Sequence, residues 1–322
     1  MPETFNLPSP LQEVTFPPIT DRGIRLLVKR DDLIHSEVSG NKWRKLKLNI
    51  EKLRQRGNSC LLTLGGAHSN HTAATAAAAE MYGLRSIGVI RGEDANMSNF
   101  TLSFARAKGM ELYPISRQDY RRARVGELRE EFLSQFGAFY FVPEGGANDL
   151  GRMGCMDIMK ELGSAAADRV FVACGTGTTF CGMGLANLGQ SMIYGVSALR
   201  GGAYLMEGVR SSLCDLLGVE AGEEILSRMR FLDNFHFGAY ARITPELTEF
   251  MRSFFRYTGI RLDPIYTAKC AFAMKTLAED AENDGLQVGG YDGETWVLVH
   301  SGGLQGIPAM EARYGLRFYE DC

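Results

Sequence analysis

Basic residues crowd the start of the segment "SGNKWRKLKLNIEKLRQRG" at residues 39–57. Leu46, Ile50 and Leu53 recur at helical spacing, so the segment is predicted to form an amphipathic helix. Unpaired amides and the helix dipole disfavour positive charge in the first turns of a helix. Four cations nevertheless lie there, at Lys42, Arg44, Lys45 and Lys47. Either they are solvated charges on a surface helix, or an anion docks among them, or one lysine serves as an amine nucleophile.

A second segment, "RVFVACGTGTTFCGMG" at residues 169–184, is predicted to form a buried strand, a tight loop and the start of a helix. In the loop, Gly175 and Gly177 let backbone amides converge on the positive end of the helix. Hydroxyl donors lie beside these amides, at Thr176, Thr178 and Thr179. The P-loop pattern and the acidic residue of a dinucleotide-binding fold are both absent. The loop is therefore predicted to hold a phosphate, with a plain glycine turn as the alternative.

A third segment, "LLTLGGAHSNHTAATAAAAEMYG" at residues 61–83, repeats the order of strand, glycine-rich turn and helix. Ser69 or Asn70 is expected to cap the helix, and capping alone would explain either residue. The amides of Ser69, Asn70 and His71 could equally hold a carboxylate. An amine, a phosphate site and a carboxylate site together indicate pyridoxal 5′-phosphate (PLP) as the cofactor and an amino acid as the substrate.

The elements that position these loops alternate between strands and helices along nearly the whole chain, which is typical of parallel sheets with helices on both faces. Strands are predicted at residues 24–30, 60–64, 86–91, 111–115, 138–142, 169–174, 192–198 and 296–300. Helices are predicted at residues 42–57, 70–83, 97–109, 124–136, 151–163, 178–189, 205–217, 245–258 and 268–281.

The glycine-rich stretch "EGGAND" at residues 144–149 is interpreted as a domain junction. A small domain is predicted at residues 57–150, and a large PLP-binding domain is predicted to combine residues 1–56 with 151–322. Ligands of open α/β sheets bind beyond the carboxyl ends of the strands. The active site is therefore expected in a cleft between the two domains.

Composition narrows the classes of partner. The 322 residues include 35 Lys and Arg against 38 Asp and Glu, a net charge of −3, which gives no electrostatic footprint for nucleic acid or an anionic membrane. The seven cysteines are scattered, lack a C-x-x-C pair and are interpreted as reduced thiols. With no leader-like or membrane-spanning run, a cytoplasmic protein with small-molecule partners is expected. His68 and His71 lack a third ligand, so no metal site is expected.

Taken together, the motifs resemble those of the 1-aminocyclopropane-1-carboxylate deaminase and D-cysteine desulfhydrase family. The shared motifs, in chain order, are "KRDDL", "SGNKWRKL", "GGAHSNH", "GTGTT", "DPIYTAK" and "HSGG". The resemblance spans about residues 8–315. It implies an α/β, tryptophan synthase β-like fold (PLP fold type II) with two open, mostly parallel twisted sheets and helices on both faces, in a homodimer.

The resemblance also implies which residues bind the cofactor. Lys42 would bind PLP covalently and act in catalysis, with Lys45 near the phosphate, and Asn70 would hydrogen-bond the phenolic oxygen. The phosphate would be held by the loop residues Gly175, Thr176, Gly177, Thr178 and Thr179.

For the substrate, the resemblance implies a carboxylate site at the amides of Ser69, Asn70 and His71. The Ser69 hydroxyl would face the reacting carbons. Tyr240 and Tyr266 would complete the catalytic site.

Two positions depart from the ring-opening deaminase pattern, which has Glu after the tyrosine of "DPxY" and Leu after the histidine of "HxGG". This chain has Thr267 and Ser301 there. Hydroxyl residues match the desulfhydrase side of the family, where the cofactor's pyridine nitrogen meets a neutral partner, and both residues are expected to contact the cofactor. A weaker electron sink still supports α-proton removal when a good β leaving group follows.

The predicted reaction is therefore α,β-elimination from a small amino acid, with D-cysteine giving pyruvate, ammonia and hydrogen sulfide. Alternatives within the same site are deamination of 1-aminocyclopropane-1-carboxylate and action on D-serine or another D-amino acid. Rivals of other classes are a catalytically silent binding protein and a phosphosugar or nucleotide enzyme that uses the 175–179 loop without PLP. The presence of Lys42, Asn70 and the threonine loop argues against a silent protein.

Overall fold

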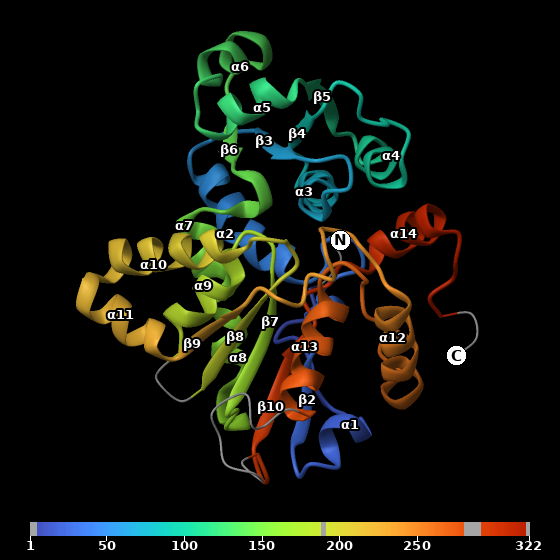
Figure 1. Ribbon diagram of the computed structural model, residues 1–322. Helices are drawn as coiled ribbons and strands as arrows, with labels where there is room; N and C mark the ends of the chain where they lie inside the picture. The colour runs from blue at the N-terminus through green and yellow to red at the C-terminus, as the bar shows by residue number, and fades with distance from the viewer. Residues whose placement is uncertain (1–4, 188–190, 280–290, 320–322) are drawn as a thin grey trace.

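The computed structural model describes residues 5–187, 191–279 and 291–319, which form two lobes, each built on its own sheet (Figure 1). The strands are β1 (Leu11–Glu13), β2 (Arg25–Lys29), β3 (Cys60–Gly65), β4 (Arg85–Arg91), β5 (Glu111–Ile115), β6 (Tyr140–Val142), β7 (Arg169–Cys174), β8 (Met192–Ser197), β9 (Met229–Leu232) and β10 (Thr295–Val299). The α-helices are α1 (Pro17–Thr20), α2 (Asn41–Gln55), α3 (Asn70–Met81), α4 (Phe100–Ala107), α5 (Arg117–Arg124), α6 (Arg129–Phe136), α7 (Asp149–Cys155), α8 (Asp157–Leu162), α9 (Thr178–Leu185), α10 (Ala203–Leu217), α11 (Val219–Ser227), α12 (Pro245–Thr258), α13 (Thr267–Glu279) and α14 (Ile307–Tyr314).

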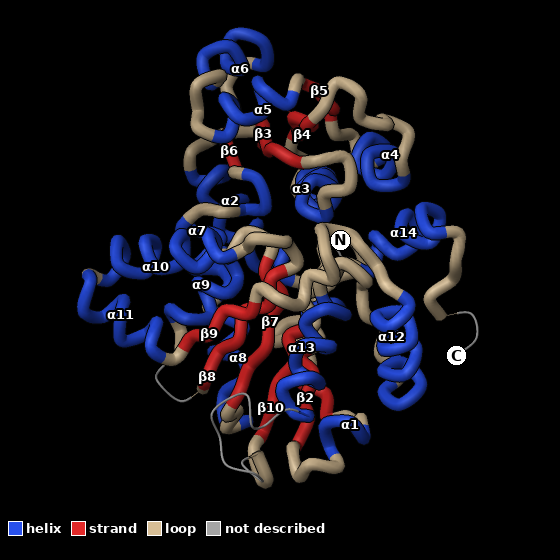
Figure 2. The backbone as a smooth tube through the Cα atoms, in the orientation of Figure 1, coloured by secondary structure: helices blue, strands red, loops and turns tan. Residues whose placement is uncertain are grey.

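The large sheet has the strand order β1-β2-β10-β7-β8-β9, and every pairing is parallel except that of β1 with β2. Helices cover both of its faces (Figure 2). Leu26 and Val28 of β2 pack in one apolar cluster, whereas Leu27 between them packs in the cluster on the opposite face. Because successive side chains of a strand alternate between faces, a strand buried on both sides must be apolar throughout.

The small sheet is entirely parallel, with the order β5-β4-β3-β6. Helix α3 lies against β3 and β4, and its Ala74, Ala77 and Ala78 are almost fully buried in the same cluster as Leu61 of β3. Short alanine side chains let the helix approach the sheet closely. None of the helices in the described part of the chain is long and apolar enough to cross a membrane.

Helix α2 belongs to the cores of both lobes. Its apolar residues Leu46, Ile50 and Leu53 pack in the cluster of the small lobe. Its Arg44, in contrast, is buried against the segment that follows β2 of the large sheet, where the guanidinium donates to both carboxylate oxygens of Asp31 at 2.6 and 2.7 Å. The sequence assigns residues 1–56 to the large domain, but this helix joins the two lobes.

Arg44 is the centre of a buried cluster of four charges. Its guanidinium also donates to both oxygens of Glu161 at 2.8 Å, and Lys29 donates to the same carboxylate at 2.7 Å. Two cations therefore balance the carboxylates of Glu161 and Asp31. Burial alone would raise the pKa of Glu161, but the hydrogen bonds from Arg44 and Lys29 outweigh it and lower that pKa to about 2.

Each predicted strand is present to within two residues at either end, and the 245–258 helix is as predicted. Strands β1 and β9 and helices α1, α5, α11 and α14 were not predicted. The helix predicted at 124–136 ends as predicted but begins too early: Gly126 adopts a left-handed φ of 86°, and α6 begins at Arg129. The helix predicted at 151–163 is divided into α7 and α8. Parts of two predicted helices, residues 188–189 and 280–281, lie outside the described residues.

We expect Arg44→Met to destabilise the protein by about 3–5 kcal/mol, because it leaves a buried carboxylate without its cation. Lys47→Met on the same helix is the matched control: Lys47 pairs with the partly exposed Asp157, and its loss is expected to cost about 1 kcal/mol or less. Urea unfolding measures both values. Equal costs for the two variants would contradict the proposed importance of the buried cluster.

The same cluster gives a pH dependence with a defined sign. Because the pKa of Glu161 falls from 4.5 to about 2 on folding, its contribution to stability is complete above pH 4.5 and is lost as the pH falls toward 2. Arg44→Met should reduce this acid-dependent loss, since the carboxylate then has a higher pKa in the folded state. Unfolding free energies measured between pH 6 and pH 2 test this.

Candidate active site

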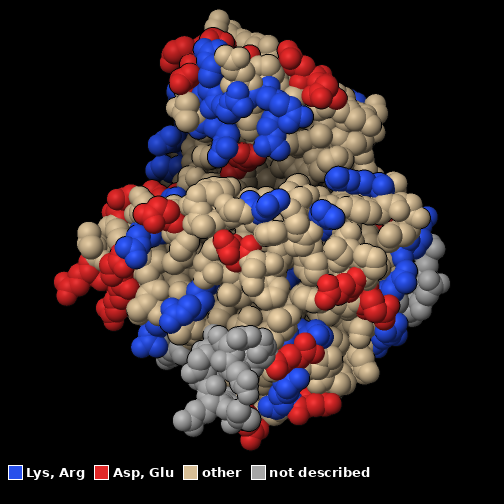
Figure 3. Space-filling model, viewed as in Figure 1, with Lys and Arg blue, Asp and Glu red and all other residues tan. Residues whose placement is uncertain are grey.

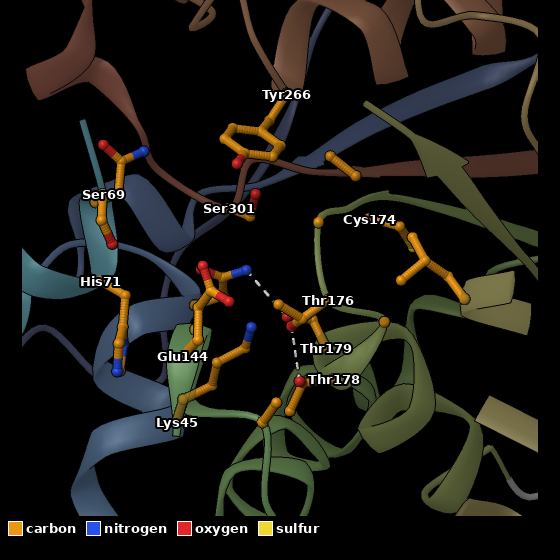
Figure 4. A pocket seen from close by; sticks show the side chains of 18 of the residues that line it. Lys45, Ser69, His71, Glu144, Cys174, Thr176, Thr178, Thr179, Tyr266 and Ser301 are labelled. Carbon is orange, nitrogen blue, oxygen red and sulfur yellow. Dashed lines mark hydrogen bonds between the residues drawn. The ribbon is translucent and has the colours of Figure 1, made fainter. Parts of the chain in front are cut away.

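A cavity of about 580 Å³ opens where the carboxyl ends of strands from both sheets meet, a size typical of small-molecule sites (Figure 4). The loops that follow β7 and β10 line it from the large lobe, and those that follow β3 and β6 line it from the small lobe. The predicted site residues that line it are Lys42, Lys45, Ser69, Asn70, His71, Gly175, Thr176, Gly177, Thr178, Thr179, Tyr240, Tyr266 and Ser301. Thr267 does not line it.

Lys42 lies in this cavity at the start of α2. Its Nζ donates to Asn41 Oδ1 at 2.7 Å, and Asn41 Nδ2 in turn donates to Thr179 Oγ1 at 2.9 Å. The lysine is thereby connected to the loop that follows β7. Burial lowers the pKa of Lys42 to about 7, and the positive charge of Lys45 contributes. Much of the amine is therefore neutral, and nucleophilic, near neutral pH.

The four cations at the start of α2 have separate environments. Arg44 belongs to the buried cluster with Asp31, and Lys47 pairs with Asp157. Lys42 and Lys45 face the cavity, and neither has a carboxylate within ion-pair distance in the described part of the chain. Burial also lowers the pKa of Lys45. Two amines that face the cavity without a carboxylate partner make this end of it a site for an anion.

The 175–179 loop has the geometry of an anion site. Gly177 adopts a left-handed φ of 74°, and α9 begins at the next residue, Thr178, so the first amides of the helix lack intrahelical partners. The Thr176 and Thr178 hydroxyls lie 2.8 Å apart and share one hydrogen bond. Figure 4 shows the Lys45 side chain pointing toward these threonines. Amides, hydroxyls and an ammonium group therefore lie at the same end of the cavity, and these are the donors that a phosphate requires.

The turn before α3 provides a second set of donors. Ser69 is the N-cap, and its Oγ accepts from Thr72 N at 3.2 Å. The Ser69 amide is already used, because it donates to Gly66 O at 3.0 Å. The amides of Asn70 and His71 are the first two of the helix and lack intrahelical acceptors. The structure thus leaves two of the three predicted amides available to a carboxylate.

His71 is buried at the cavity wall. Neither of its ring nitrogens has a hydrogen-bond partner among the described residues. Burial, with the nearby charges of Lys42 and Lys45, lowers the pKa of His71 well below its usual value, so the ring is neutral. A buried polar group without a partner is costly unless a ligand satisfies it.

The two tyrosines meet across the cavity. Tyr266 Oη donates to Tyr240 Oη at 3.2 Å, and the rings form an edge contact. A Cβ at position 175 would lie 3.3 Å from the Tyr266 ring, so Gly175 is needed for this close approach. Burial raises the pKa of Tyr266 well above its usual value, and its hydroxyl keeps its proton at neutral pH.

A buried lysine fixes the loop that carries Tyr240. Phe237 and Ala241, on either side of the tyrosine, both adopt a left-handed φ of 55°, which is strained for residues with a side chain. Lys269 Nζ holds the loop by donating to His236 O at 2.9 Å and to Ala239 O at 3.2 Å. Lys269 and Tyr266 both come from the "DPIYTAK" motif, which therefore positions the two tyrosines together.

Thr267 and Ser301 have different environments. The Thr267 hydroxyl is fully buried and donates to Asp263 Oδ1 at 2.8 Å. The same Asp263 carboxylate accepts the amides of Ile265, Tyr266 and Thr267, so it caps α13 and fixes the tyrosine. The expectation that Thr267 contacts the cofactor finds no support in this placement. Ser301 does line the cavity, where a hydroxyl rather than a carboxylate is presented.

The sequence profile of the family described as pyridoxal-phosphate dependent enzymes matches residues 3–302. The chain belongs to this family. A Pyrococcus abyssi protein, named provisionally as a 1-aminocyclopropane-1-carboxylate deaminase, is 29% identical over 88% of this chain and 86% of its own length. The Arabidopsis thaliana bifunctional D-cysteine desulfhydrase/1-aminocyclopropane-1-carboxylate deaminase, described as mitochondrial, is 28% identical over 94% of this chain and 78% of its own.

Solved structures confirm the fold of this PLP enzyme. A crystal structure described as an ACC deaminase homologue superposes with a TM-score of 0.78 and 26% identity, covering 96% of this chain and 95% of the other. A cysteine synthase from Entamoeba histolytica, at 18% identity, has a TM-score of 0.65 over 94% of this chain and 87% of its own. The predicted tryptophan synthase β-like fold, fold type II of PLP enzymes, is therefore confirmed, as are PLP as cofactor and the class of PLP-dependent lyase or deaminase.

The cavity fits PLP chemically. Lys42 offers an amine of lowered pKa for a carbonyl group, and the 175–179 loop with Lys45 offers donors for a phosphate. The two ring nitrogens of His71 have no partner among the described residues and are able to bind a ligand. The residues present can therefore hold a cofactor that combines an aldehyde with a phosphate.

Asn41, Arg91, Arg124 and Glu144 are among the cavity residues that were not predicted as site residues. Asn41 links Lys42 to the threonine loop, and it stands inside the "GNK" motif, so its position next to the lysine was the available signal. Arg91, Arg124 and Glu144 line the cavity from the small lobe. Glu144 begins "EGGAND", which was interpreted only as a junction, and nothing local in the sequence places the two arginines at the site.

We predict that the rate of PLP uptake by the cofactor-free protein rises with pH through about 7, because the neutral Lys42 amine is the reactive form. Stopped-flow absorbance measures the rate, and borohydride reduction with peptide mapping should place the label on Lys42. Lys45→Met should shift the midpoint upward, since removing a neighbouring positive charge raises the pKa of Lys42. A midpoint near 10 in the wild type, or a label on Lys45, would contradict the assignment.

We also predict that Lys269→Met lowers kcat by about tenfold or more while PLP binding is unchanged. A misplaced Tyr240 needs to raise the activation free energy by only about 1.4 kcal/mol to give a tenfold loss. Lys275→Met, on the same helix but paired at the surface with Glu279, is the control and should leave kcat unchanged. Lys269→Arg should restore part of the rate, since it can again donate to both carbonyls. Equal losses in the two methionine variants would refute a positioning role.

Proposed function

We propose that this PLP enzyme catalyses α,β-elimination from a small amino acid, with D-cysteine as the first candidate. The observation that carries the proposal is the Lys42 amine, which has a pKa of about 7 and lies in a cavity that also presents a phosphate site and free amides. Such an amine can accept a proton from the α carbon near neutral pH. The names of the relatives support elimination and ring opening equally.

Ser301 favours elimination over ring opening. Its hydroxyl is a neutral partner for a cofactor nitrogen, which suffices when an α proton can be removed. 1-Aminocyclopropane-1-carboxylate has no α hydrogen, so its ring must open by another route. Among the described residues that line the cavity, Glu144 alone carries a carboxylate, and it lies on the opposite lobe from Ser301. Ring opening is therefore the second candidate.

For the cofactor, we propose that Lys42 binds PLP covalently and that Lys45 lies near its phosphate. The donors to that phosphate are proposed to come from Gly175, Thr176, Gly177, Thr178 and Thr179. Asn70 is proposed to hydrogen-bond the phenolic oxygen. The line of hydrogen bonds from Lys42 through Asn41 to Thr179 supports this arrangement, because it holds the amine and the phosphate loop in register.

For the reaction, bound PLP would withdraw electrons from the substrate's α carbon. Lys42 Nζ takes the α proton, and the thiolate leaves the β carbon with its bonding electrons. The Tyr266 hydroxyl donates its hydrogen bond to Tyr240. The Tyr240 hydroxyl can therefore donate its own proton to the departing sulfur. With one water consumed, D-cysteine gives pyruvate, ammonia and hydrogen sulfide.

The substrate carboxylate is proposed to bind the amides of Asn70 and His71, with the Ser69 hydroxyl facing the reacting carbons. The Ser69 oxygen accepts from Thr72 N, and its hydrogen remains able to reach the substrate. A homodimer and a cytoplasmic location belong to the same proposal. The second is supported by the six described cysteines, none of which forms a disulfide.

The experiment that tests the proposal is a keto acid assay of the PLP-loaded enzyme. Pyruvate should be released from D-cysteine and β-chloro-D-alanine, and little 2-oxobutyrate from 1-aminocyclopropane-1-carboxylate. Tyr240→Phe should slow pyruvate release by about 10²-fold or more if it donates the proton. Robust 2-oxobutyrate release with no activity on D-amino acids would favour the second candidate. A PLP absorption band without any turnover would favour a silent binding protein.

A further inference from the structure

Three charged side chains of the small lobe line the cavity without a part in the proposed reaction: Arg91, Arg124 and Glu144. Arg91 is the last residue of β4, Arg124 ends α5, and Glu144 follows β6. Parallel strands bring their carboxyl ends to one edge of a sheet, so Arg91 and Glu144 share the edge that faces the large lobe. Figure 3 shows Lys and Arg side chains gathered on the small lobe above the hollow between the lobes. Arg91, Arg124 and Glu144 together are called the charged wall below.

Within the charged wall, one arginine is free of any carboxylate. Arg124 Nε lies 3.3 Å from Glu144 Oε2, so these two charges offset each other. Arg91 has no carboxylate within ion-pair distance among the described residues, and its guanidinium stacks 5.6 Å from the ring centroid of Tyr120. The wall therefore carries one net positive charge, centred on Arg91.

Arg91 lines the cavity beside the turn that is proposed to hold the substrate carboxylate. Its guanidinium is 3.3 Å from the position that a Cβ of Gly66 would take, so it packs on the turn that leads to Ser69. It also faces Tyr240 from the opposite lobe: burial raises the pKa of Tyr240, whereas the positive charge of Arg91 lowers it. Arg91 is thus beside the carboxylate turn and within electrostatic reach of the tyrosine of the reaction.

The donors of the cavity described so far already have proposed roles. Lys42, Lys45 and the threonine loop serve the cofactor, and the amides of Asn70 and His71 serve the α-carboxylate. A guanidinium that remains unpaired beside them suits a second carboxylate, sulfonate or phosphate, because such a pair forms two charge-assisted hydrogen bonds. An amine-bearing side chain fits less well, since Arg124 offsets Glu144.

We propose that Arg91, with the Arg124–Glu144 pair beside it, binds a second anionic group, so that the preferred substrates are amino acids with a negatively charged β substituent. The inference rests on the proposed elimination and narrows its substrate class. D-Cysteine then reports only whether elimination occurs. A negatively charged β substituent would bind more tightly, because it also contacts Arg91.

The test compares aspartate with asparagine, which have the same shape and differ in charge, by titration calorimetry of the PLP-loaded enzyme. Neither has a heteroatom leaving group on the β carbon, so binding is measured without elimination. Each enantiomer is titrated. For the enantiomer that binds, aspartate should bind at least about tenfold tighter than asparagine, the lower end for a charge-assisted hydrogen bond.

Two arginine variants separate the site from general attraction. Arg91→Met should reduce the preference for aspartate to about twofold or less, with the PLP band and melting temperature unchanged. Arg121→Met is the matched control, because Arg121 is exposed on α5 of the same lobe and does not line the cavity. It should keep the wild-type preference. Glu144→Gln should raise the preference, since it frees Arg124.

Three outcomes would overturn the inference. One is equal or tighter binding of asparagine by the wild type. Another is an equal loss of preference in Arg91→Met and Arg121→Met, which would indicate long-range attraction alone. The third is equal weakening of both ligands by Arg91→Met, which would assign Arg91 to the α-carboxylate. Pyruvate release from the neutral β-chloro-D-alanine is assayed in parallel, so failure of elimination is distinguished from failure of this inference.

Discussion

The buried contact between Arg44 and Asp31 is the constraint on which the active site depends. Arg44 is one turn of helix or less from both cavity lysines, so the ion cluster that fixes Arg44 also fixes the start of α2. Both oxygens of Asp31 are used by Arg44, and Glu161 is used by Arg44 and Lys29. No member of the cluster neutralises Lys42 or Lys45. The same interaction that anchors the helix leaves two buried amines for an anionic cofactor.

A second constraint comes from Asp263, which acts on the opposite wall. Its carboxylate accepts three backbone amides at the start of α13 and thereby fixes the direction of Tyr266. One turn further along, Lys269 holds the strained loop of Tyr240. One short motif therefore determines the positions of both tyrosines. Replacing Thr267 by Glu would place a second carboxylate against Asp263, so the residue at this position affects the helix start before it affects the cofactor.

Periodicity predicted most of the fold because most strands are buried on both faces and are largely apolar. It failed where packing rather than local pattern decides the structure. The short β1 pairs only at the sheet edge with β2, and β9 has mixed burial, so neither has a distinctive run. The helix predicted at residues 124–136 begins only at Arg129, because a left-handed Gly126 interrupts the backbone before α6. Helix α2 shows an apolar stripe in the sequence, but not that the stripe faces the small lobe.

The sequence by itself determined the family, the cofactor and the lysine that lines the cavity, because the fold type and its motifs are local patterns of residue type and spacing. Only the tertiary structure decided which charged side chains form stabilising ion pairs and which stay unpaired in the active-site cavity. Arg44 and Lys45 are adjacent in sequence, yet one is neutralised by carboxylates 13 and 117 residues away and the other is not. Arg91 and Glu144 likewise share one wall of the cavity only because parallel strands of the small sheet end at the same edge. Electrostatic partnership depends on distance in space, and the chain order does not record it.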